Sequence, residues 1–361
     1  MKFGGSEQQI INLVEASNRR GLSGYIFCYE GSDLANRADQ IKGKVIAVKK
    51  QKPFAPGILH ALKAAVKQHQ IDVIHIHNGK FILPYMLAGI FLGLKRPAIF
   101  SKKDMSRSSS LLSKLKYNYS KIYRTACVTE SIKKRFQHIL YPKNHHKLVV
   151  LRHGVNMKKL QDLVPEDIYS GLNIPKETII IGNVANHVRA KGLRTLVLTL
   201  DYLVNTKGIH NIRVVQIGRF SDLTEDLKSL TAEKNLQEYL IFTGFLQYGF
   251  KYTSQFDYFI MTSQSEGMPQ AALESFFYKI PVVSTNAGGI PEIIKHEING
   301  MLADVDDYEG LGNNIIRLME DQPLKNRIVA NAYELIINEL NSEVMTDKTI
   351  GLYKDALANS Q

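Results

Sequence analysis

Two glutamates in one short stretch are the side chains best placed to do chemistry in this sequence. Glu266 and Glu274 belong to the run Ser263-Gln-Ser-Glu-Gly-Met-Pro-Gln-Ala-Ala-Leu-Glu274. The apolar segment Tyr258–Thr262 before it predicts a strand, and Pro269 stands where the first residue of a helix is favoured. Free N–H groups at a helix start attract phosphate, and carboxylates accept hydrogen bonds from hydroxyl groups. Taken alone, the stretch leaves open a capped helix with two solvated glutamates.

Positive and polar side chains follow another predicted strand, Thr178–Ala185. Lys191 stands with Gly192 just before a helical period, and Asn186 and Arg189 come a few residues earlier. Alone, Lys191 is best interpreted as an exposed lysine in front of a helix. Beside a phosphate-binding loop, the same lysine becomes a candidate for neutralising a diphosphate leaving group.

Two histidines, His75 and His77, lie two residues apart in a predicted strand and therefore face the same way. A metal pair would need further ligands, and no Cys is close in the sequence. We therefore expect His77 to end the strand at a binding site and His75 to pack behind it. Gly4 and Gly5 form a different motif, a turn that would let the backbone approach a phosphate.

The elements that must position these side chains follow a regular order. Short β-branched runs alternate with longer amphipathic stretches, which predicts an α/β protein with parallel sheets flanked by helices. The alternation occurs twice, with a break near residues 152–175 that is polar and contains two prolines. We expect one domain at 1–155 and another at 156–341, with the C-terminal helix 342–361 packing back onto the first.

Length and composition limit the class of protein. A chain of 361 residues exceeds what one core usually supports, and 44% hydrophobic residues suffice for two cores. Cys28 and Cys127 lie in apolar runs without metal-ligand spacing, which indicates reduced thiols in a reducing compartment. No run approaches the roughly 18 apolar residues that span a bilayer, and no signal peptide is visible. We expect a soluble cytoplasmic protein, at most peripheral on the inner face of the membrane.

The net charge of +12 is divided unevenly along the chain. Residues 1–152 carry 27 Lys/Arg against 8 Asp/Glu, whereas the remainder carries 19 against 26. The segment Lys95–Arg152 alone has 15 Lys/Arg against two acidic residues. Apolar side chains recur within it at helical spacing beside lysines, at Leu111, Leu112, Leu115, Tyr119 and Ile122.

This pattern predicts an amphipathic basic helix suited to an anionic membrane surface. A solvated charged face is the alternative. Nucleic acid is not expected as a partner, because no binding module is recognisable and the second half of the chain is acidic.

Taken in order, the motifs resemble glycosyltransferase family 4, whose members share the GT-B fold. The matching segments run through nearly the whole chain: Gly4-Gly5, Asp72-Val-Ile-His-Ile-His77, Val128-Thr-Glu-Ser131, Gly154-Val-Asn156, Lys191-Gly192, Phe242-Thr-Gly244, Glu266-Gly-Met-Pro269, Glu274, Pro281–Ile294 and Asn299-Gly300. The resemblance implies two Rossmann-like domains facing across a cleft, a nucleotide-sugar donor and retention of the anomeric configuration. The first domain lacks its opening strand in this comparison, since only three residues precede Gly4.

The resemblance also implies roles for single residues. Glu274 would hold the ribose hydroxyls of the donor, Glu266 would contact hydroxyls of the transferred sugar, and Lys191 would neutralise the diphosphate. Gly5 would allow the backbone to approach a donor phosphate. The segment that would meet the sugar and the distal phosphate through backbone N–H groups comprises Gly267, Met268, Pro269 and Gln270.

Two departures from the family pattern affect these roles. Asn186 stands where the family usually has an arginine, and Arg189 is the candidate to supply that cation. Lys103 stands at about the place of a histidine that many members carry near the acceptor. The catalytic candidates are therefore Glu266, Lys191, His77 and Lys103. No metal is expected, since the family has a plain acidic surface loop where this chain has Asp304-Val-Asp306.

The function that the resemblance implies is transfer of a hexose-type sugar from a nucleotide diphosphate donor, with a uridine nucleotide favoured over guanosine. The acceptor would be a glycan or glycolipid at the inner face of a membrane, in polysaccharide or lipopolysaccharide synthesis. Two alternatives remain: a nucleotide-sugar epimerase or hydrolase on the same fold, and a catalytically impaired nucleotide-sugar or membrane-surface binding protein.

Overall fold

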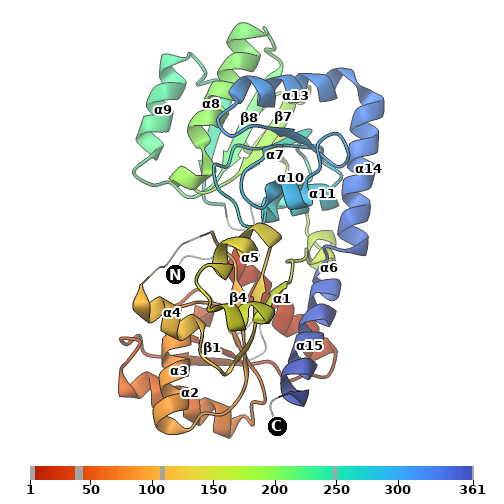
Figure 1. Ribbon diagram of the computed structural model, residues 1–361. Helices are drawn as coiled ribbons and strands as arrows, with labels where there is room; N and C mark the ends of the chain where they lie inside the picture. The colour runs from red at the N-terminus through yellow and green to blue at the C-terminus, as the bar shows by residue number, and fades with distance from the viewer. Residues whose placement is uncertain (1–4, 37–43, 106–109, 247–249, 360–361) are drawn as a thin grey trace. The chain divides into compact units, whose positions relative to one another are not determined.

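The computed structural model describes residues 5–36, 44–105, 110–246 and 250–359. Contacts divide the chain into two compact units, unit 1 formed by Met1–Gly154 with Ser342–Gln361 and unit 2 formed by Val155–Asn341. These limits fall within one residue of the predicted domain boundaries. Both units are built from parallel strands and helices (Figure 1), which confirms the predicted α/β class with two Rossmann-like domains.

Unit 1 contains two parallel sheets. One pairs β1 with β2, and the other has the order β3-β4-β5-β6. The strands are β1 (Ile26–Tyr29), β2 (Val45–Val48), β3 (Ile74–Ile76), β4 (Ala98–Lys102), β5 (Ile122–Cys127) and β6 (Leu148–Val150). Within the described residues, β1 pairs with β2, and no pairing joins β1 to β3. Residues 1–4, before which the opening strand was predicted to be missing, lie outside the described residues.

The helices of unit 1 fall between its strands, apart from the last one. They are α1 (Gly5–Arg19), α2 (Pro56–Gln68), α3 (Ile82–Leu92), α4 (Leu111–Tyr117), α5 (Glu130–Gln137), the 3-10 helix η2 (Pro142–Lys147) and α15 (Ser342–Ala358). Two starts are fixed by side-chain caps, because the Ser110 hydroxyl accepts from the Ser113 N–H and that of Thr129 accepts from the Ile132 N–H. Local sequence therefore sets where α4 and α5 begin.

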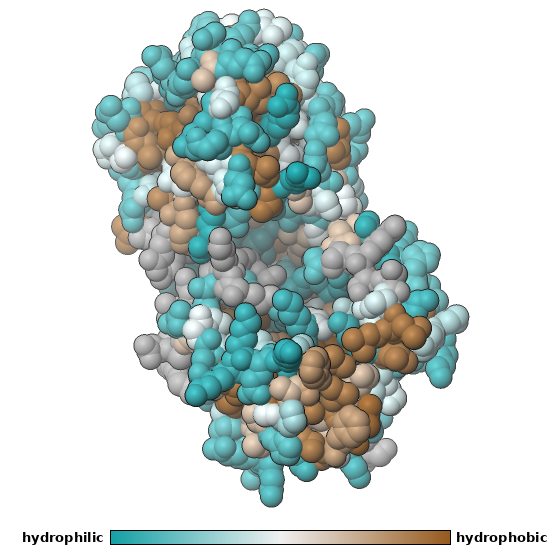
Figure 2. All heavy atoms as spheres, turned by 90° about the vertical axis from the view of Figure 1, so that its left-hand side faces the viewer, coloured by the Kyte–Doolittle hydropathy of each residue, from teal (hydrophilic) through white to brown (hydrophobic). Residues whose placement is uncertain are grey.

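The predicted basic helix is shorter than expected. α4 ends at Tyr117, so Tyr119 lies beyond it, and Ile122 opens β5 with only 1% of its surface exposed. Ile122 matches the helical spacing only by coincidence, since it is the first residue of β5 and not part of a helix. The exposed leucines of α4 remain on the surface, and Figure 2 shows an apolar region on unit 1, on the side where Figure 1 draws α3 and α4. Within the described residues, no helix combines the length and apolar character needed to cross a membrane.

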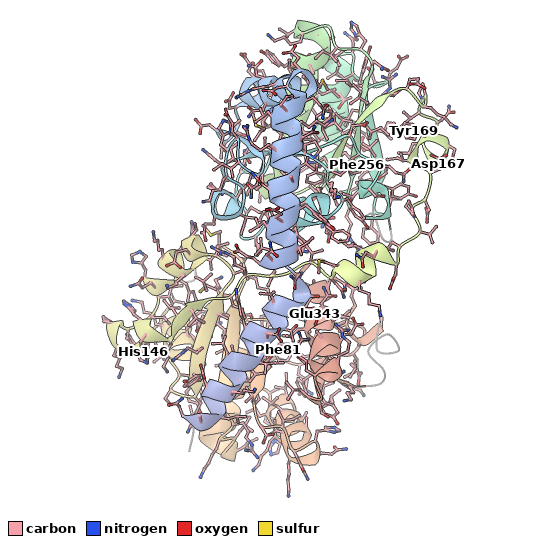
Figure 3. The ribbon with its side chains drawn as sticks, turned by 90° about the vertical axis from the view of Figure 1, so that its right-hand side faces the viewer. Phe81, His146, Asp167, Tyr169, Phe256 and Glu343 are labelled. Carbon is pink, nitrogen blue, oxygen red and sulfur yellow. The ribbon has the colours of Figure 1, made fainter. Side chains whose placement is uncertain are left out.

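The C-terminal helix α15 completes unit 1. Glu343, labelled in Figure 3, pairs with Arg19 at 2.6 Å and with Arg20 at 2.7 Å, both from α1. Farther along, the Tyr353 hydroxyl lies 2.7 Å from His75 Nδ1, and Ala356 is fully buried against the four-stranded sheet. Exposed ion pairs contribute little, so the apolar contacts are the main stabilisation of this helix.

Unit 2 contains one sheet of six parallel strands in the order β12-β11-β10-β7-β8-β9. The strands are β7 (Ile179–Val184), β8 (Ile212–Ile217), β9 (Leu240–Gly244), β10 (Tyr258–Met261), β11 (Val282–Thr285) and β12 (Met301–Ala303). Buried β-branched residues dominate them, as expected for strands covered by helices on both faces. The chain adds β8 and β9 on one side of β7 and then returns to place β10 on the other.

The helices of unit 2 cover the sheet. They are α6 (Met157–Gln161), α7 (Ile168–Gly171), the 3-10 helix η3 (Arg189–Lys191), α8 (Leu193–Asp201) with a π-helical last turn η4 (Tyr202–Thr206), α9 (Thr224–Glu233), α10 (Phe250–Thr253), α11 (Gln270–Phe277), α12 (Ile290–Ile293), α13 (Tyr308–Glu320) and α14 (Gln322–Asn338). Asp307 and Asp321 cap α13 and α14 through the N–H groups of Gly310 and Leu324.

Close packing at the centre of unit 2 explains one glycine of β7. A Cβ on Gly182 would lie 1.9 Å from the ring of Phe256, a fully buried side chain labelled in Figure 3. The missing side chain therefore makes room for an aromatic ring against the strand that leads to the candidate site.

Candidate active site

The two loops that carry the main candidates leave neighbouring strands at one edge of the unit 2 sheet. The Lys191 loop follows β7 and the Glu266 loop follows β10, and these strands pair directly. Because strand order reverses between them, their carboxyl ends form the switch point at which doubly wound sheets bind ligands. The loops also touch, since the Gln264 N–H donates to the Ala190 carbonyl at 2.9 Å.

The structure brings Lys191 and Glu266 together as an ion pair. Lys191 Nζ lies 2.6 Å from Glu266 Oε2, and their side chains are 27% and 15% exposed. Ser263 Oγ lies 3.4 Å from the same oxygen, and the Ser263 carbonyl accepts from Thr285 Oγ1 at 2.6 Å. The pair is thus partly shielded from water, anchored from β11, and still open enough to meet a ligand.

Two glycines allow the backbone of these loops to approach so closely. Gly192 has a φ of +56°, and a Cβ there would lie 2.1 Å from the Thr262 carbonyl oxygen. Gly288 has a φ of +58°, and a Cβ there would lie 2.3 Å from the Glu266 carbonyl oxygen. Any larger residue at either position would be strained and would push the ion pair apart.

Helix α11 begins at Gln270, so Pro269 stands just before the first helical position at which it was predicted. Pro269 has φ −80° and ψ 77°, which is not helical, and it forms the cap before Gln270 rather than the first helical residue. Met268 and Pro269 are buried, whereas Gly267 and Gln270 are half-buried at the same loop. The segment predicted to meet the donor therefore lies directly between the ion pair and the start of an eight-residue helix.

Glu274 lies in the second turn of α11. Burial raises the pKa of its carboxyl to about 7, although a hydrogen bond from Gln270 and the charge of Lys159 act in the opposite direction. Near neutral pH the group therefore exchanges between its acid and carboxylate forms. Such a carboxyl favours any ligand whose hydroxyls stabilise the ionised form.

Asn186, which stands in place of the family arginine, and Arg189, the candidate to supply that cation, are both exposed in the loop after β7. Asn186 Oδ1 accepts from the Arg219 N–H at 2.9 Å, so its side chain braces the next loop along the sheet. Arg189 opens the 3-10 turn that ends with Lys191. The structure thus places Arg189 on the same short turn as Lys191, and its contact with a diphosphate stays a prediction.

A buried histidine that sequence reasoning missed holds this loop in place. His187 is 1% exposed, with Nε2 at 2.8 Å from Gln216 Oε1 and Nδ1 at 2.8 Å from Thr224 Oγ1. Gln216 Nε2 donates to the Ala185 carbonyl at 2.7 Å, which leaves its Oε1 as the acceptor. The His187 proton therefore belongs on Nε2, and Nδ1 accepts from the Thr224 hydroxyl.

The same network reaches the strand that leads to Glu266. Asn183 Nδ2 donates to the Ile260 carbonyl of β10 at 2.8 Å, and Gln216 Nε2 lies 3.4 Å from Asn183 Oδ1. The His187 carbonyl accepts from Ser221 Oγ at 2.5 Å. This role could not be predicted from the sequence. His187 lies in a loop between two exposed residues, and only the fold turns its ring inward.

In unit 1, His75 and His77 are stacked rather than separated. Their ring centroids lie 3.9 Å apart, and His75 Nε2 lies 2.8 Å from Ser101 Oγ. Burial, helped by the charge of Lys103, lowers the pKa of His75 to about 3. Burial also holds the pKa of His77 well below its usual value, with contributions from neighbouring charges. Both rings are therefore neutral at physiological pH.

Lys103 and His153 belong to the same group of side chains. Burial lowers the pKa of Lys103 to about 8, and burial together with Lys103 lowers the pKa of His153 to about 3. A lysine of this kind loses its proton more readily than an exposed one. The predicted catalytic Lys103 therefore lies within electrostatic range of three neutral imidazoles. Gly5, the remaining candidate in unit 1, is the first residue of α1.

Nowhere in the described part of the chain do three His, Cys, Asp or Glu side chains gather as metal ligands. The acidic triplet is engaged elsewhere, because Asp306 accepts from Thr195 Oγ1 at 2.9 Å and Asp304 accepts from Asn286 Nδ2 at 2.7 Å. Its carboxylates hold loops of unit 2 together.

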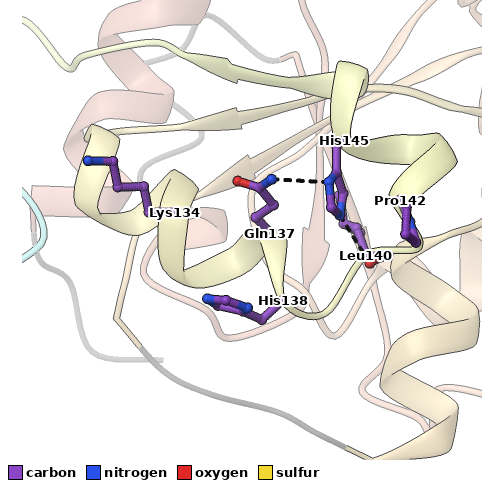
Figure 4. Close-up of a pocket in the computed structure, with 6 residues that line it drawn as sticks. All are labelled: Lys134, Gln137, His138, Leu140, Pro142 and His145. Carbon is purple, nitrogen blue, oxygen red and sulfur yellow. Dashed lines mark hydrogen bonds between the residues drawn. The ribbon is translucent and has the colours of Figure 1, made fainter.

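A surface pocket of about 530 Å³ opens on unit 1, and none of the predicted site residues lines it. Figure 4 shows its lining by Lys134, Gln137, His138, Leu140, Pro142 and His145. Gln137 Nε2 lies 3.0 Å from His145 Nδ1, so the polar groups of the wall bind one another. We assign no chemistry to this pocket.

The sequence matches two family models. Residues 166–335 match "Glycosyl transferases group 1", and residues 3–159 match "Glycosyltransferase Family 4". Between them the models span nearly the whole chain, and they follow the two units. With a switch-point site in a two-domain α/β fold, these matches define a GT-B glycosyltransferase. The chain belongs to glycosyltransferase family 4 and is a hexosyltransferase-type enzyme.

Relatives carry the same class of activity. The chain is 24% identical over 316 residues to UDP-Gal:alpha-D-GlcNAc-diphosphoundecaprenol alpha-1,3-galactosyltransferase of Escherichia coli, covering 83% of this chain and 80% of that protein. It is 21% identical to the lipopolysaccharide core biosynthesis glycosyltransferase LpsD of Rhizobium meliloti, covering 98% and 96%. These likenesses support a glycosyltransferase of surface glycan synthesis.

The fold is shared with solved structures. Anabaena Alr3699/HepE in complex with UDP-glucose superposes with a TM-score of 0.83 at 18% identity, covering 98% of this chain and 97% of that one. At this identity the likeness establishes the fold.

Proposed function

We propose that the enzyme transfers a hexose from a uridine diphosphate sugar to a glycan or glycolipid acceptor, with retention of the anomeric configuration. Unit 2 would bind the donor, and unit 1 would bind the acceptor. The reaction would need no metal, because side-chain charge would neutralise the diphosphate.

The observation that carries this proposal is the Lys191–Glu266 pair at the switch point of the unit 2 sheet. A cation held at 2.6 Å from a carboxylate, beside the start of α11, offers one group for phosphate and another for sugar hydroxyls. Glu274, in the second turn of that helix, would accept hydrogen bonds from the ribose. Glu274, Lys191 and Glu266 would thus meet the ribose, the diphosphate and the hexose of one nucleotide sugar.

The proposed chemistry depends on stabilising the leaving group. As the bond from the anomeric carbon to the diphosphate oxygen breaks, the acceptor hydroxyl oxygen bonds to that carbon on the same face. The hydroxyl proton leaves with the diphosphate, so atoms and charges balance. Lys191 would stabilise the charge that develops on the diphosphate, and Arg189 would add to it. Lys103 and His77 would orient the acceptor hydroxyl.

Relatives favour uridine as the base. The Escherichia coli relative is named for a UDP-galactose donor, and the Anabaena structure holds UDP-glucose. The printed acceptor of the former is a diphosphoundecaprenol-linked sugar, which supports a lipid-linked acceptor here. Together with the basic Lys95–Arg152 segment, this favours action at the cytoplasmic face of the membrane, in lipopolysaccharide or polysaccharide synthesis.

The direct test is turnover by the purified full-length chain. UDP-glucose, UDP-galactose and their N-acetyl forms would be supplied with a GlcNAc-diphospholipid acceptor, in the presence of a chelator. We expect a disaccharide-lipid product whose new linkage has the anomeric configuration of the donor, read by NMR coupling constants. An inverted product would overturn the retaining assignment, and activity that depends on added metal would overturn the metal-free one.

Donor-only reactions separate the alternatives. Release of free sugar or a changed sugar epimer without acceptor would instead identify a hydrolase or an epimerase. Saturable donor binding with no turnover on any acceptor of this class would identify a binding protein. GDP-sugars serve as the control for the base, and we expect them to bind more weakly than UDP-sugars.

A further inference from the structure

Two helices of unit 1 present apolar side chains to solvent at neighbouring places. On α3, Ile90 is 58% and Phe91 is 72% exposed, and on α4 Leu111, Leu112 and Leu115 are 76%, 51% and 52% exposed. We call these five residues the α3–α4 patch. Single exposed apolar residues are common, but a cluster of five large ones marks a surface that contacts something other than water.

The two helices are packed against each other through their inner faces. Tyr119, two residues after the end of α4, packs against α3: a Cβ on Gly89 would lie 2.1 Å from its hydroxyl, and its ring lies 5.7 Å from that of Tyr85. Lys116 Nζ on α4 donates to the Gly79 carbonyl just before α3. Because these contacts take the inner faces, the outer faces of both helices are left together on one side, where Figure 2 shows the apolar region.

The composition of α3 is unusual for a surface helix. Its eleven residues, Ile-Leu-Pro-Tyr-Met-Leu-Ala-Gly-Ile-Phe-Leu, include no charged side chain. A surface helix normally carries polar residues on the face that meets water. The buried face is already provided by Ile82, Tyr85 and Ala88, so burial within unit 1 does not explain Ile90 and Phe91.

Charge identifies the partner. Between residues 80 and 124 the sequence holds ten Lys/Arg and a single acidic residue, Asp104, which pairs with Lys102 at 2.6 Å. Lys95, Lys114 and Lys121 are exposed at or next to the two helices. Apolar side chains surrounded by cations are suited to an anionic bilayer. The apolar side chains can enter the acyl-chain region, and the cations can bind the lipid phosphates.

We propose that the α3–α4 patch docks the enzyme onto anionic phospholipid, with Phe91, Leu111 and Leu112 entering the acyl region. The inference rests on the proposed lipid-linked acceptor and adds the surface that would bring the enzyme to it. Docking is reversible, because burial of five apolar side chains and attraction of a few lysines to phosphates are both weak interactions compared with a membrane-spanning helix.

The test is sedimentation of the full-length chain with vesicles. The vesicles would be phosphatidylcholine alone or an equal mixture with phosphatidylglycerol. We expect binding to the mixture, weakened by salt, and at least about ten-fold less to phosphatidylcholine alone. The double variants Ile90→Ser/Phe91→Ser and Leu111→Ser/Leu112→Ser should each lower binding about ten-fold or more. Val164→Ser is the matched control, since Val164 is 77% exposed on unit 2, and it should bind like the parent chain.

Several outcomes would overturn the inference. The proposal fails if the chain does not bind the mixed vesicles, or if both double variants bind as tightly as the parent. It also fails if the variants change the oligomeric state by analytical ultracentrifugation, which would make a second copy the occupant. Thermal melts check that the exposed substitutions leave the fold intact. Transfer to a short-chain, water-soluble acceptor should be unchanged in the variants, so loss of vesicle binding and loss of the proposed activity are distinguishable.

Discussion

The two units use the same architecture for sites of opposite character. In unit 2, the candidate site consists of charged groups already joined to one another, as in the 2.6 Å contact between Lys191 and Glu266. In unit 1, His75, His77 and His153 are neutral and lie within electrostatic range of Lys103, whose pKa burial lowers to about 8. If unit 2 binds the donor and unit 1 the acceptor, as proposed, donor recognition would rely on fixed charge, whereas the acceptor side would rely on shape and neutral hydrogen-bonding groups.

The largest effect is expected at the ion pair. Lys191→Met and Glu266→Gln should each lower kcat/KM for sugar transfer about 10²–10³-fold, because Lys191 would stabilise the departing diphosphate and Glu266 the sugar. Steady-state assays with UDP-sugar measure this. Lys228→Met is the control, since Lys228 pairs with exposed Glu225 at 2.9 Å elsewhere on unit 2 and should leave activity unchanged. Near-normal activity of Lys191→Met would remove the proposed catalytic role.

The next variant tests the division of labour between the units. Lys103→Met should lower kcat about 10–100-fold through loss of a group that orients the acceptor, while the Kd of UDP-glucose stays within about two-fold. Isothermal titration and turnover assays give the two numbers separately. Lys63→Met on α2, an exposed lysine, is the matched control. A large rise in the donor Kd would show that unit 1 shares donor binding and would break the comparison.

A pH dependence is expected from Glu274. Burial raises the pKa of its carboxyl to about 7. If the nucleotide sugar binds only the ionised carboxylate, binding should weaken as pH falls below that value. The affinity for UDP-glucose should therefore fall about ten-fold from pH 8 to pH 6, while the diphosphate of this ligand does not titrate in that range. Titration calorimetry at several pH values measures it. In Glu274→Gln the slope should vanish, and a slope that survives would assign the titration to another group.

The smallest effect on chemistry should come from His187, which acts only through the loop it holds. His187→Leu leaves Gln216 Oε1 without its donor, a loss of about 1–3 kcal/mol in the free energy of unfolding. The donor KM should rise several-fold with kcat little changed, and His187→Gln should restore part of it. Exposed His210 provides the control variant His210→Leu. Equal loss of kcat and of donor affinity would instead indicate general misfolding.

Sequence predicted the parts that depend on chain-local rules. The alternation of strands and helices, the domain boundaries and the Glu266 loop follow from periodicity, proline and glycine positions. The pairing of Lys191 with Glu266 was not derivable from spacing, because 75 residues separate them and only the adjacency of β7 and β10 brings them together. Pro269 shows that the sequence does not predict the end of an element to the residue, since Pro269 is the N-cap of α11 and not its first helical residue.

The features that sequence missed are those decided by tertiary packing. Ile122 fitted a helical period, yet it begins β5, because its side chain is buried in the core of unit 1. His187 looked like a loop residue until Gln216 and Thr224 supplied partners for both ring nitrogens. The exposed apolar face of α3 was not predicted, because its packing beside the chain that follows α4, where Gly89 approaches Tyr119, depends on the tertiary fold.

The chain enters unit 1 first and returns to it last, through α15. During synthesis from the N-terminus, residues 155–341 must therefore leave the ribosome before the helix that supplies Ala356 and Tyr353 to the sheet of unit 1 is available. Unit 2 is continuous and can fold as soon as it emerges, whereas unit 1 waits for α15. The unit made first is thus the one finished last, and a chain ending before Ser342 would retain a complete unit 2 with an unfinished unit 1.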